Sequence, residues 1–591
     1  MSSPPVTHPT TAQAYGQPAQ FGEAFGFLHP APGRIGTVII PHWGYEGLCF
    51  HPMFRRLAGD LAAAGLPCVR YDPPGTGHSG DVDDEADLIA AWVRSIGAAV
   101  AALRETTNAR AVVLIGFGLG AAAAAQSAAD LEDVAGLALV APWLAGGRAL
   151  RELAAAGHLA ADAMGLAPGV GAPPGGLSVA GFTLTSAHRE SLARVRISPE
   201  SCARALNTLI VARPEQGAAA RTFADALTPP ARIVTFEGYD KAAFDPSNFV
   251  MPQDTIAAIV AWAHGLAAAP DPAEPPAPPA PAPARAVMGL NDAVQEEAVR
   301  FGPRDGLFGV LAAPAAAPPR AAAILVNAGR NRAIGWARGD VAEARRLAAS
   351  GVVALRFDLA GVGDSAPESA DEPLYDARRA VDVSAAIDLI ESRFGAMPVA
   401  LRGPCSGAFL AFAAALADSR VKGAALINAQ RYVWNPRDDF DTVMRQPVHL
   451  VEIAREARDP RQIARLMRGE ISPLRLTRRL TKKFVREAQA FAGRLGFSGT
   501  HDARLVAQGR RGFDELARRG VALTVIVSQG DRAIEELKLY FGDEAHFLRA
   551  HGPQALVRIE NADHNLTAPQ ARRAASEAFD ALIARIIRDD A

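Results

Sequence analysis

The chain has 591 residues, of which 49% are hydrophobic and 21% charged, and its formal net charge is −2. This length exceeds what one hydrophobic core supports and predicts at least two domains, while the composition is that of a folded globular protein. The near-neutral charge gives no reason to expect nucleic acid or an anionic membrane surface as a partner. The four cysteines are scattered, without metal-type spacing or a disulfide framework, which favours a reducing compartment.

The beginning of the chain predicts neither export nor membrane insertion. Residues 1–20 are polar and rich in Pro, Thr and Ala, with no basic segment and no continuous apolar one, so we expect no secretory signal. No uncharged apolar run approaches the roughly 18–20 residues that a membrane helix needs. The sequence carries no metal-site, nucleotide-loop or nucleic-acid motif. We therefore expect a cytoplasmic protein with no cofactor, no integral membrane segment and no nucleic-acid partner; the sequence predicts no particular oligomeric state.

A stretch made almost entirely of Ala and Pro, residues 267–285, interrupts the chain near its middle. Proline lacks a backbone donor and fixes its own φ, so such a stretch forms a semi-rigid extended linker. We therefore predict a first domain over residues 20–266, a linker over residues 267–286 and a second domain over residues 287–591.

The two predicted domains repeat one order of elements. Each has an apolar strand, a helix, a strand ending in Arg-x-Asp, a Gly-rich loop, a long helix, and a strand that enters a turn bounded by glycines. Strands that alternate with helices predict an α/β fold, with a mostly parallel sheet covered by helices. The elements are Thr37–Ile40, Phe54–Ala64, the strand ending at Asp72, residues 73–80 and Gly116–Gly120 in the first domain, and Ala323–Val326, Ala342–Ala349, the strand ending at Asp358, residues 359–365 and Gly403–Gly407 in the second.

The turn in the second domain has a cysteine at its centre. The run Gly403-Pro404-Cys405-Ser406-Gly407 reads Gly-x-nucleophile-x-Gly, with cysteine where serine is usual. In such a nucleophile elbow the glycines permit close packing, and the central residue adopts a strained conformation above the sheet. A lone cysteine is more often a small buried hydrophobic residue. Its place at the centre of this turn nevertheless favours Cys405, rather than Ser406, as a nucleophile.

The order of elements resembles the α/β-hydrolase superfamily, and within it the serine-aminopeptidase-like, lysophospholipase-like subgroup. The segment Arg356–Ser365 reads Arg-x-Asp-x-x-Gly-x-Gly-x-Ser, a mark of that subgroup, and the elbow follows at the expected interval. The resemblance covers nearly the whole chain, twice. It implies a tandem duplication into two α/β-hydrolase domains, of which the second has a larger helical cap over about residues 430–520.

The resemblance also implies which residues complete a catalytic triad in the second domain. The order in this family is nucleophile, acid, histidine. This order implies Asp531, just after the predicted strand Ala522–Val527, and His564, just after the last strand. Glu535, one helical turn further on, is the alternative acid. His564 would take the proton of Cys405, and the acid would orient the imidazole.

Backbone N–H groups are expected to form the oxyanion hole that stabilises a tetrahedral intermediate. In this fold one N–H belongs to the residue after the nucleophile, and the other to the loop after an early strand. We therefore expect Ser406 to supply one donor and Gly329 or Arg330 the other.

The first domain lacks such a set. Gly118 stands at the centre of its elbow and has no side chain to attack a substrate. Glu215 follows the predicted strand Thr208–Ala212 as at best a vestigial acid, and no histidine follows the last strand. Glycine also relieves the strain of the elbow. We interpret the first domain as a catalytically inactive copy that is kept for structure or binding.

The predicted cap of the second domain is longer than the matching first-domain segment and is rich in arginine. Residues 475–486 contain no acid, and their apolar residues recur at helical spacing, which predicts a basic amphipathic helix. One interpretation is a lid helix with a solvated basic face. The other is a lip that attracts an anionic or carrier-bound acyl substrate (a phosphopantetheine carrier, CoA or an acidic glycan) through Arg478, Arg479, Lys482 and Lys483.

Three functions follow from these observations. The first is an acyl ester or thioester hydrolase in which Cys405 forms an acyl-enzyme that water releases. The second is an acyltransferase that passes the acyl group to a hydroxyl acceptor. Polyhydroxyalkanoate synthases and dienelactone hydrolases also use cysteine in this fold, but their elbows read Gly-x-Cys-x-Gly-Gly, whereas Ala408 follows the second glycine here. The third is a non-catalytic binding protein, against which the set of Cys405, Asp531 and His564 argues.

Overall fold

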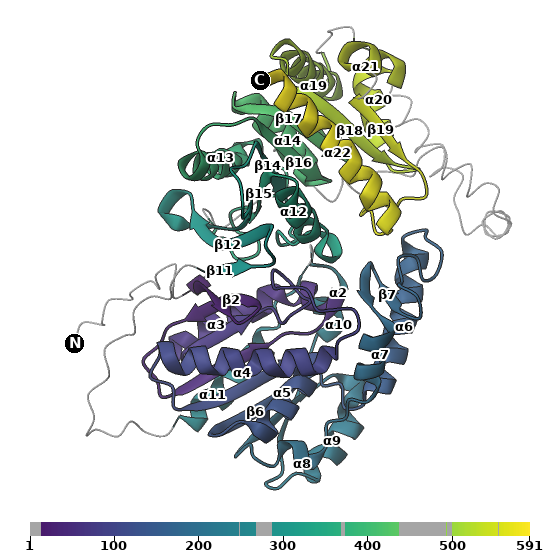
Figure 1. Cartoon of the computed structure of the whole chain (residues 1–591). Coiled ribbons are helices and arrows are strands. Elements are labelled where there is room, and N and C mark those ends of the chain that lie inside the picture. Colours follow the sequence, from purple (N-terminus) through teal and green to yellow (C-terminus); the bar gives the residue numbers. More distant parts are fainter. Residues whose placement is uncertain are drawn as a thin grey trace, which may run out of the picture.

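The computed structural model forms two α/β halves joined through residues 268–285 (Figure 1). Strands within residues 17–235 build one large sheet, and strands within residues 286–559 build the other. The domain boundaries given above stay a prediction, and "first half" and "second half" are used here for the chain before and after that segment. The described residues are 14–246, 249–267, 286–367, 373–435, 492, 494, 499–552 and 555–590.

The first half contains an eight-stranded sheet in the order β1-β2-β4-β3-β5-β6-β9-β10. Strand β2 is antiparallel to β1 and β4, and all pairs from β4 to β10 are parallel. Central strands such as β5 and β6 are covered on both faces, which explains their continuous apolar sequences. The strands are β1 Gln17–Phe21, β2 Ala24–His29, β3 Ile35–Ile40, β4 Cys68–Tyr71, β5 Ala111–Phe117, β6 Val134–Val140, β9 Thr208–Ala212 and β10 Arg232–Thr235, with a separate hairpin of β7 Leu177–Val179 and β8 Phe182–Leu184.

The second half contains a nine-stranded sheet in the order β11-β12-β13-β15-β14-β16-β17-β18-β19. Strands β11 to β13 and the β13–β15 pair are antiparallel, and the pairs from β15 to β19 are parallel. Without the edge strand β11, the order matches that of the first sheet strand for strand. The strands are β11 Ala286–Gly289, β12 Val294–Phe301, β13 Leu307–Pro314, β14 Ala321–Val326, β15 Val352–Asp358, β16 Val399–Pro404, β17 Val421–Ile427, β18 Ala522–Ser528 and β19 Leu556–Ile559.

Helices cover both faces of each sheet. In the first half α4 and α5 pack on one face and α3 and α11 on the other. In the second half α13, α14 and α19 pack on one face and α12 and α22 on the other. These layers confirm the predicted α/β fold of two mostly parallel sheets covered by helices. The helices are α2 Gly44–Cys49, α3 His51–Ala63, α4 Leu88–Thr106, α5 Leu119–Asp130, α6 Gly146–Ala163, α7 Ser186–Ala193, α8 Pro199–Cys202, α9 Gly217–Asp225, α10 Tyr239–Phe244, α11 Gln253–Leu266, α12 Gly339–Ala349, α13 Ala380–Phe394, α14 Ser406–Ala417, α19 His501–Arg518, α20 Ala533–Phe541, α21 Glu544–His551 and α22 Pro569–Asp590.

Two of the predicted helices begin earlier than their apolar patterns indicate. Helix α3 begins at His51 rather than Phe54, since Pro52 fits the first helical turn, where no backbone donor is needed. Helix α12 begins at Gly339 rather than Ala342, directly after a short 3₁₀ turn over Trp336–Arg338.

The two halves meet where the antiparallel edges of their sheets face each other. Phe25 and Phe27 of β2 form one buried cluster with Met288 of β11 and with Phe308 and Val310 of β13. The rings of Phe27 and Phe308 pack edge to face, with their centroids 4.9 Å apart. The boundary therefore has an apolar centre built from equivalent strands of both halves, and Figure 1 shows β2 and β11 side by side there.

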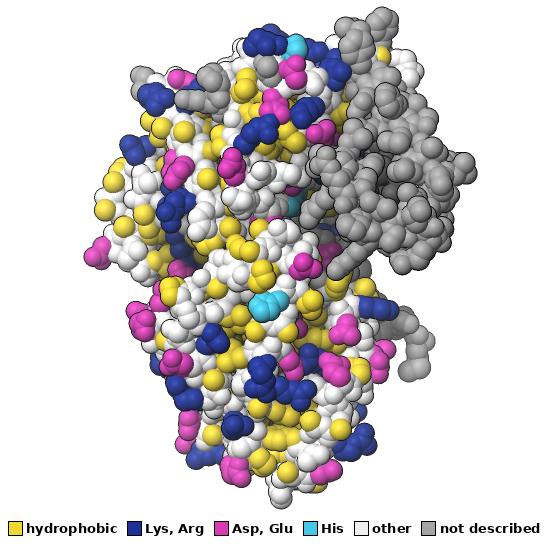
Figure 2. Space-filling model, turned by 90° about the vertical axis from the view of Figure 1, so that its right-hand side faces the viewer, with side chains coloured by type: hydrophobic (Ala, Val, Ile, Leu, Met, Phe, Trp, Pro, Cys, Tyr) yellow, Lys and Arg dark blue, Asp and Glu magenta, His cyan; other side chains and the backbone are white. Residues whose placement is uncertain are grey.

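The described surface mixes charges of both signs. Figure 2 shows Lys and Arg side chains interspersed with Asp and Glu on the face that it draws. Among the described helices, none combines the length and the apolar character that crossing a bilayer requires.

Candidate active site

Cys405 stands at the turn between β16 and α14 with the backbone of a nucleophile elbow. Its φ is 53° and its ψ is −117°, a conformation that is strained for a residue with a side chain. A Cβ on Gly403 would overlap the Gly407 carbonyl, and a Cβ on Gly407 would lie 2.6 Å from the Val326 oxygen. The Cys405 N–H donates to the Ile427 oxygen at 2.8 Å. Both flanking glycines are therefore needed for the strand and helix to approach this closely.

His564 and Asp531 lie together at the same edge of the sheet. Asp531 follows β18 and His564 follows β19, and His564 Nδ1 is 2.7 Å from Asp531 Oδ2. Asn428 holds the histidine loop, because its Nδ2 donates to the His564 oxygen at 2.8 Å. Glu535, the alternative acid, is exposed, and its carboxylate contacts Lys538 at 3.4 Å. The geometry thus brings Asp531, and not Glu535, to the imidazole.

The imidazole of His564 also hydrogen-bonds Cys405. Burial acts to lower the pKa of His564, but the hydrogen bonds to Asp531 and Cys405 and the charges of these groups outweigh it and raise the pKa to about 10. His564 is therefore a cation at neutral pH.

A tyrosine and a tryptophan that the sequence analysis did not single out complete this side of the site. Burial, together with the charge of the neighbouring Cys405, raises the Tyr375 pKa well above its ordinary value. Its ring stacks on Trp434 with the centroids 4.9 Å apart and packs edge to face on Phe409. Tyr375 belongs to no periodic element, so no sequence pattern indicated it.

The predicted oxyanion donors lie on two segments that touch. We call residues 327–338, between β14 and α12, the oxyanion loop. The Gly329 N–H donates to Ser406 Oγ at 2.8 Å, so the loop is tied to the elbow by the side chain of Ser406. The Ser406 N–H is the first of α14, and the first N–H groups of a helix have no intrahelical acceptor. Gly329, Arg330 and Ser406 also line one small recess together.

A cavity of about 190 Å³ opens beside Cys405 and His564. It lies between the first turns of α12 and α22, and four arginines contribute to its lining. Arg402 donates to Asp340 at 2.8 Å, and Arg346 pairs with Glu343 and Asp580. The lining arginines are Arg346, Arg402, Arg572 and Arg573.

Arg572 is only partly compensated by its neighbours. Its Nε donates to the Leu566 oxygen at 3.0 Å, while its Nη2 is buried without a hydrogen-bond partner among the described residues. Burial lowers the pKa of Arg572, and the charge of the neighbouring Arg402 acts in the same direction. An anion placed between the two guanidinium groups would relieve both effects.

The elbow of the first half has nearly the same backbone conformation as that of the second half, but different side chains surround its centre. Gly118 has φ 54° and ψ −110°, close to the values of Cys405. A Cβ on Gly118 would overlap the ring of His42, which fills the space of the missing side chain. His42 Nε2 lies 2.6 Å from Glu46, and His42 Nδ1 lies 2.9 Å from the Trp43 oxygen. The vestigial acid Glu215 is exposed and contacts Arg213 at 3.2 Å.

The predicted lid lies outside the described residues for the most part. This applies to Arg478, Arg479, Lys482 and Lys483 and to most of the segment 430–520. Within the described part of the chain, no group of three His, Cys, Asp or Glu side chains is arranged to hold a metal ion.

Comparisons with known proteins agree with this fold. Residues 46–173, all in the first half, match the family model described as serine aminopeptidase, S33. A comparison with curated proteins finds no match.

Several solved structures resemble parts of the chain. Est1E from Butyrivibrio proteoclasticus with bound ferulic acid is 17% identical over 42% of this chain and 97% of its own, with a TM-score of 0.31. The esterase Pf2001 from Pyrococcus furiosus is 12% identical over 49% of this chain and 91% of its own, with a TM-score of 0.30. Proline iminopeptidase from Mycobacterium smegmatis is 14% identical over 42% of this chain and 98% of its own, with a TM-score of 0.27.

The sheet order, the elbow and the family match have to be taken together. The order of the strands is the same in both halves, and the elbow follows the strand next to the centre of each sheet. The family match covers the first-half elbow, at Gly118. Both halves therefore share one α/β architecture with an elbow at the same place, and residues 46–173 are similar to the serine aminopeptidase, S33 family.

Proposed function

We propose that the chain hydrolyses an acyl ester or thioester, with Cys405 as the nucleophile, His564 as the acid–base group and Asp531 as the residue that orients His564. One observation carries the proposal. A single imidazole interacts with Cys405 and with Asp531 at the same time, beside a cavity large enough for a small substrate group. Nucleophile, base and orienting acid within hydrogen-bonding reach are the arrangement that covalent catalysis requires.

The proposed reaction has two stages. The Cys405 thiolate attacks the carbonyl carbon, a C–S bond forms, and the carbonyl oxygen becomes an oxyanion. The intermediate collapses with loss of the alcohol or thiol, which takes a proton from the His564 imidazolium. Water then gives a proton to the neutral imidazole and attacks the thioester carbon. The C–S bond breaks, the carboxylic acid leaves, and the thiolate–imidazolium pair is restored.

The N–H of Ser406 is the donor that best fits the oxyanion. It lies next to the nucleophile at the positive end of the α14 dipole, where a developing negative charge is stabilised. The Gly329 N–H is engaged by Ser406 Oγ, which supports the next residue, Arg330, as the source of the second donor. The hydroxyl of Tyr375 is a further polar group at the sulfur.

The lining of the cavity supports an anionic substrate. Four arginines face two acids, Asp340 and Glu343, in the lining, and the buried Nη2 of Arg572 has no partner among the described residues. A carboxylate or phosphate accepts paired hydrogen bonds from guanidinium groups with favourable geometry. We therefore propose that the acyl group or the leaving group carries a negative charge.

The first half fits the role of an inactive copy produced by duplication. The two sheets share their strand order, and Ser79 and Ser365 make equivalent contacts, since each accepts a hydrogen bond at 2.8 Å from a backbone N–H of the matching strands β2 and β13. Gly118 has no nucleophilic atom, and His42 fills the space where one would stand. The proposed chemistry therefore uses only the second half.

The test is the fate of an acyl group offered to the protein. We expect p-nitrophenyl acetate or acetyl-CoA to acetylate the wild-type chain once, as seen by intact mass, and to be turned over rapidly in water. Slow release that an added alcohol or sugar accelerates would instead favour the acyltransferase. No adduct on the wild type, with no difference from Cys405→Ala, would contradict the proposal and favour a binding protein.

A further inference from the structure

The oxyanion loop contains several residues in a strained backbone conformation. Ala337 and Arg338, at φ 48° and 61°, follow one another in the left-handed region, and Gly329 and Gly335 also have positive φ. Residues with side chains stay in that region only where their surroundings fix them. One contact inside the loop is a hydrogen bond from Asn327 Nδ2 to the loop oxygen of Asn331, at 2.6 Å. The contacts that fix the rest of the loop include many from the first half.

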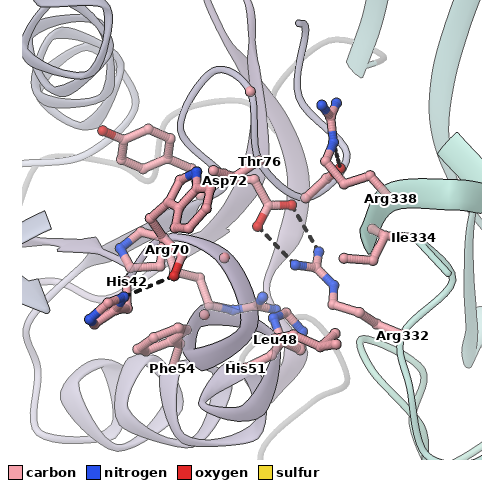
Figure 3. Close-up of a pocket in the computed structure, with 18 of the residues that line it drawn as sticks. His42, Leu48, His51, Phe54, Arg70, Asp72, Thr76, Arg332, Ile334 and Arg338 are labelled. Carbon is pink, nitrogen blue, oxygen red and sulfur yellow. Dashed lines mark hydrogen bonds and ion pairs between the residues drawn. The ribbon is translucent and has the colours of Figure 1, made fainter. Parts of the chain in front are cut away.

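Three arginines extend from the second half into the Asp72–Asp81 segment of the first half. Figure 3 shows two of them, Arg332 and Arg338. Arg332 donates to both oxygens of Asp72, at 2.8 and 2.9 Å. Arg338 donates to the oxygens of Gly77 and Ser79 and pairs with Asp81 at 2.6 Å. Arg345 of α12 pairs with Asp81 at 3.0 Å and also donates to the Ser79 oxygen.

The Arg332–Asp72 pair is buried and two-pronged. The Arg332 side chain is 6% exposed and that of Asp72 is 15% exposed. Burial acts against both charges, but each partner outweighs it: the pKa of Asp72 lies below its ordinary range, and that of Arg332 lies above. Such a pair fixes distance and direction together, because two parallel N–H···O bonds resist rotation.

Equivalent aspartates of the two halves hold neighbouring residues of this loop. Asp72 and Asp358 each end the Arg-x-Asp motif of their half. Asp72 binds the Arg332 side chain, and Asp358 accepts the N–H of Ala333 at 2.6 Å. An ion pair of the opposite orientation also crosses the boundary, because Arg70 of the first half pairs with Asp364 of the second half at 2.8 Å.

Apolar contacts support the same part of the loop. Ile334 and Val341 form a buried cluster with Leu48 of the first half, and Trp336 packs near Tyr45, with ring centroids 5.7 Å apart. At its other end the loop reaches the elbow through the hydrogen bond from Gly329 to Ser406.

We propose that the inactive first half positions the oxyanion loop of the second half. Arg332 is the positioning residue, and Asp72 is the carboxylate that binds it. This inference rests on the proposed function. The Arg-x-Asp loop of the first half then persists because its carboxylate is occupied by the active half. The first half contributes to the rate without touching the substrate, by holding the Gly329–Arg330 backbone at the distance that the oxyanion requires.

The experiment compares two variants that each remove one interaction across the same boundary. Asp72→Asn removes the charge of the carboxylate that lies closest to Arg332, at 2.8 Å against 3.7 Å for Asp364. Arg55→Gln removes a hydrogen bond to the Gly363 oxygen, at 2.6 Å, that does not reach the oxyanion loop. We measure kcat and KM for p-nitrophenyl acetate, the rate of Cys405 alkylation by iodoacetamide, and hydrogen exchange of amides 328–338. Alkylation needs the thiolate but creates no oxyanion, so it separates the oxyanion loop from the nucleophile.

We expect Asp72→Asn to lower kcat about 100-fold with KM nearly unchanged, because a loss of oxyanion stabilisation acts in the transition state. Alkylation of Cys405 should stay within about twofold of the wild type, and amides 328–338 should exchange faster. Arg55→Gln should leave turnover, alkylation and hydrogen exchange as in the wild type. Asp81→Asn, which breaks the pairs at the more exposed rim, serves as a second, milder variant and should lower kcat about 10-fold.

Two results overturn the inference. One is wild-type turnover in Asp72→Asn; the other is a loss of alkylation that matches the loss of turnover, as a general loss of structure would give. If the wild type itself shows no turnover and no acylation, the proposed hydrolysis is wrong, and hydrogen exchange then decides the positioning role alone. Unchanged exchange of amides 328–338 in Asp72→Asn would overturn it.

Discussion

The two elbows of this chain share a backbone and differ in what stands at their centre. Cys405 and Gly118 have almost the same φ and ψ, and each follows the strand next to the middle of its sheet. At Cys405 the side chain meets an imidazole that Asp531 holds. At Gly118 an imidazole, His42, occupies the side-chain position itself. The backbone conformation of the turn is thus the same whether or not its central residue has a nucleophilic side chain.

The difference adds packing to the grounds for the proposed inactivity of the first half. Restoring a side chain at residue 118 would first require His42 and its contact with Glu46 to move. Burial acts to raise the pKa of Glu46, but the His42 imidazole outweighs it, and the pKa lies below its ordinary value. The contact between His42 Nε2 and Glu46, at 2.6 Å, therefore holds the imidazole in the filled elbow. What the first half retains is its interface with the oxyanion loop.

Among the changes that compare the two elbows, removing the nucleophile should lower activity the most. We expect Cys405→Ala to lower kcat for p-nitrophenyl acetate by about 10⁴-fold or more, because no covalent intermediate can form. Cys202→Ala, which changes a buried cysteine of the first half, is the matched control and should leave kcat within about twofold. Equal losses in both variants would contradict the assignment.

Removing the orienting acid should have the next largest effect. Asp531→Asn keeps the shape of the side chain but takes away the charge that holds His564, and we expect kcat to fall about 10³- to 10⁴-fold. Glu535→Gln changes an exposed carboxylate in the same region and should have no effect on kcat. The opposite ranking in steady-state assays would show that Glu535 is the acid.

The charge of the substrate can be tested at Arg572. We expect Arg572→Leu to lower kcat/KM for an anionic ester such as a p-nitrophenyl hemisuccinate by about 10- to 100-fold, because a charge-assisted hydrogen bond is lost. The neutral acetate ester should be affected far less. A parallel loss with both esters would indicate that Arg572 only supports the histidine loop through Leu566.

Filling the empty elbow should affect stability and not activity. Gly118→Ala places a Cβ into the His42 ring at a positive φ, and we expect the free energy of unfolding to fall by about 1–3 kcal/mol. His42→Ala in the same chain should reduce that cost, so that the effects of the two substitutions are not additive. Chemical denaturation measures both, and additive effects would show that His42 does not fill this space.

A last prediction concerns the pH dependence of stability. The His564 pKa of about 10 lies above its ordinary value of about 6.5. Protonation of His564 therefore stabilises the folded chain fully below about pH 6.5, and this contribution is lost as the pH rises through about 10. The difference in unfolding free energy between the wild type and His564→Gln should shrink from pH 7 to pH 10.5. The corresponding difference between the wild type and His158→Gln, which changes an exposed histidine, should stay constant over this range. Equal pH profiles for the two variants would contradict the raised pKa of His564.

The sequence predicts the fold, and it singles out Cys405, Asp531 and His564 as candidates, for physical reasons. Central strands such as β14 are apolar throughout because both faces are covered, and a turn as tight as the one at Cys405 demands glycines at fixed positions. These are local requirements. His42, Tyr375 and Arg332 act through contacts between distant segments, and nothing in their neighbours along the chain marks them. The Arg332–Asp72 pair joins residues of different halves, so a reading that treats each half separately cannot find it.

The most direct measurement is peptide-level mass spectrometry of the acyl-enzyme after rapid acid quenching. With p-nitrophenyl acetate in excess, the account predicts one acetyl group, on Cys405, with Cys49, Cys68 and Cys202 unmodified. The adduct should persist longer in His564→Gln if it forms at all, because no base then activates water. An adduct in the first half, or turnover without any adduct on Cys405, would contradict the claim that only the second elbow performs the chemistry.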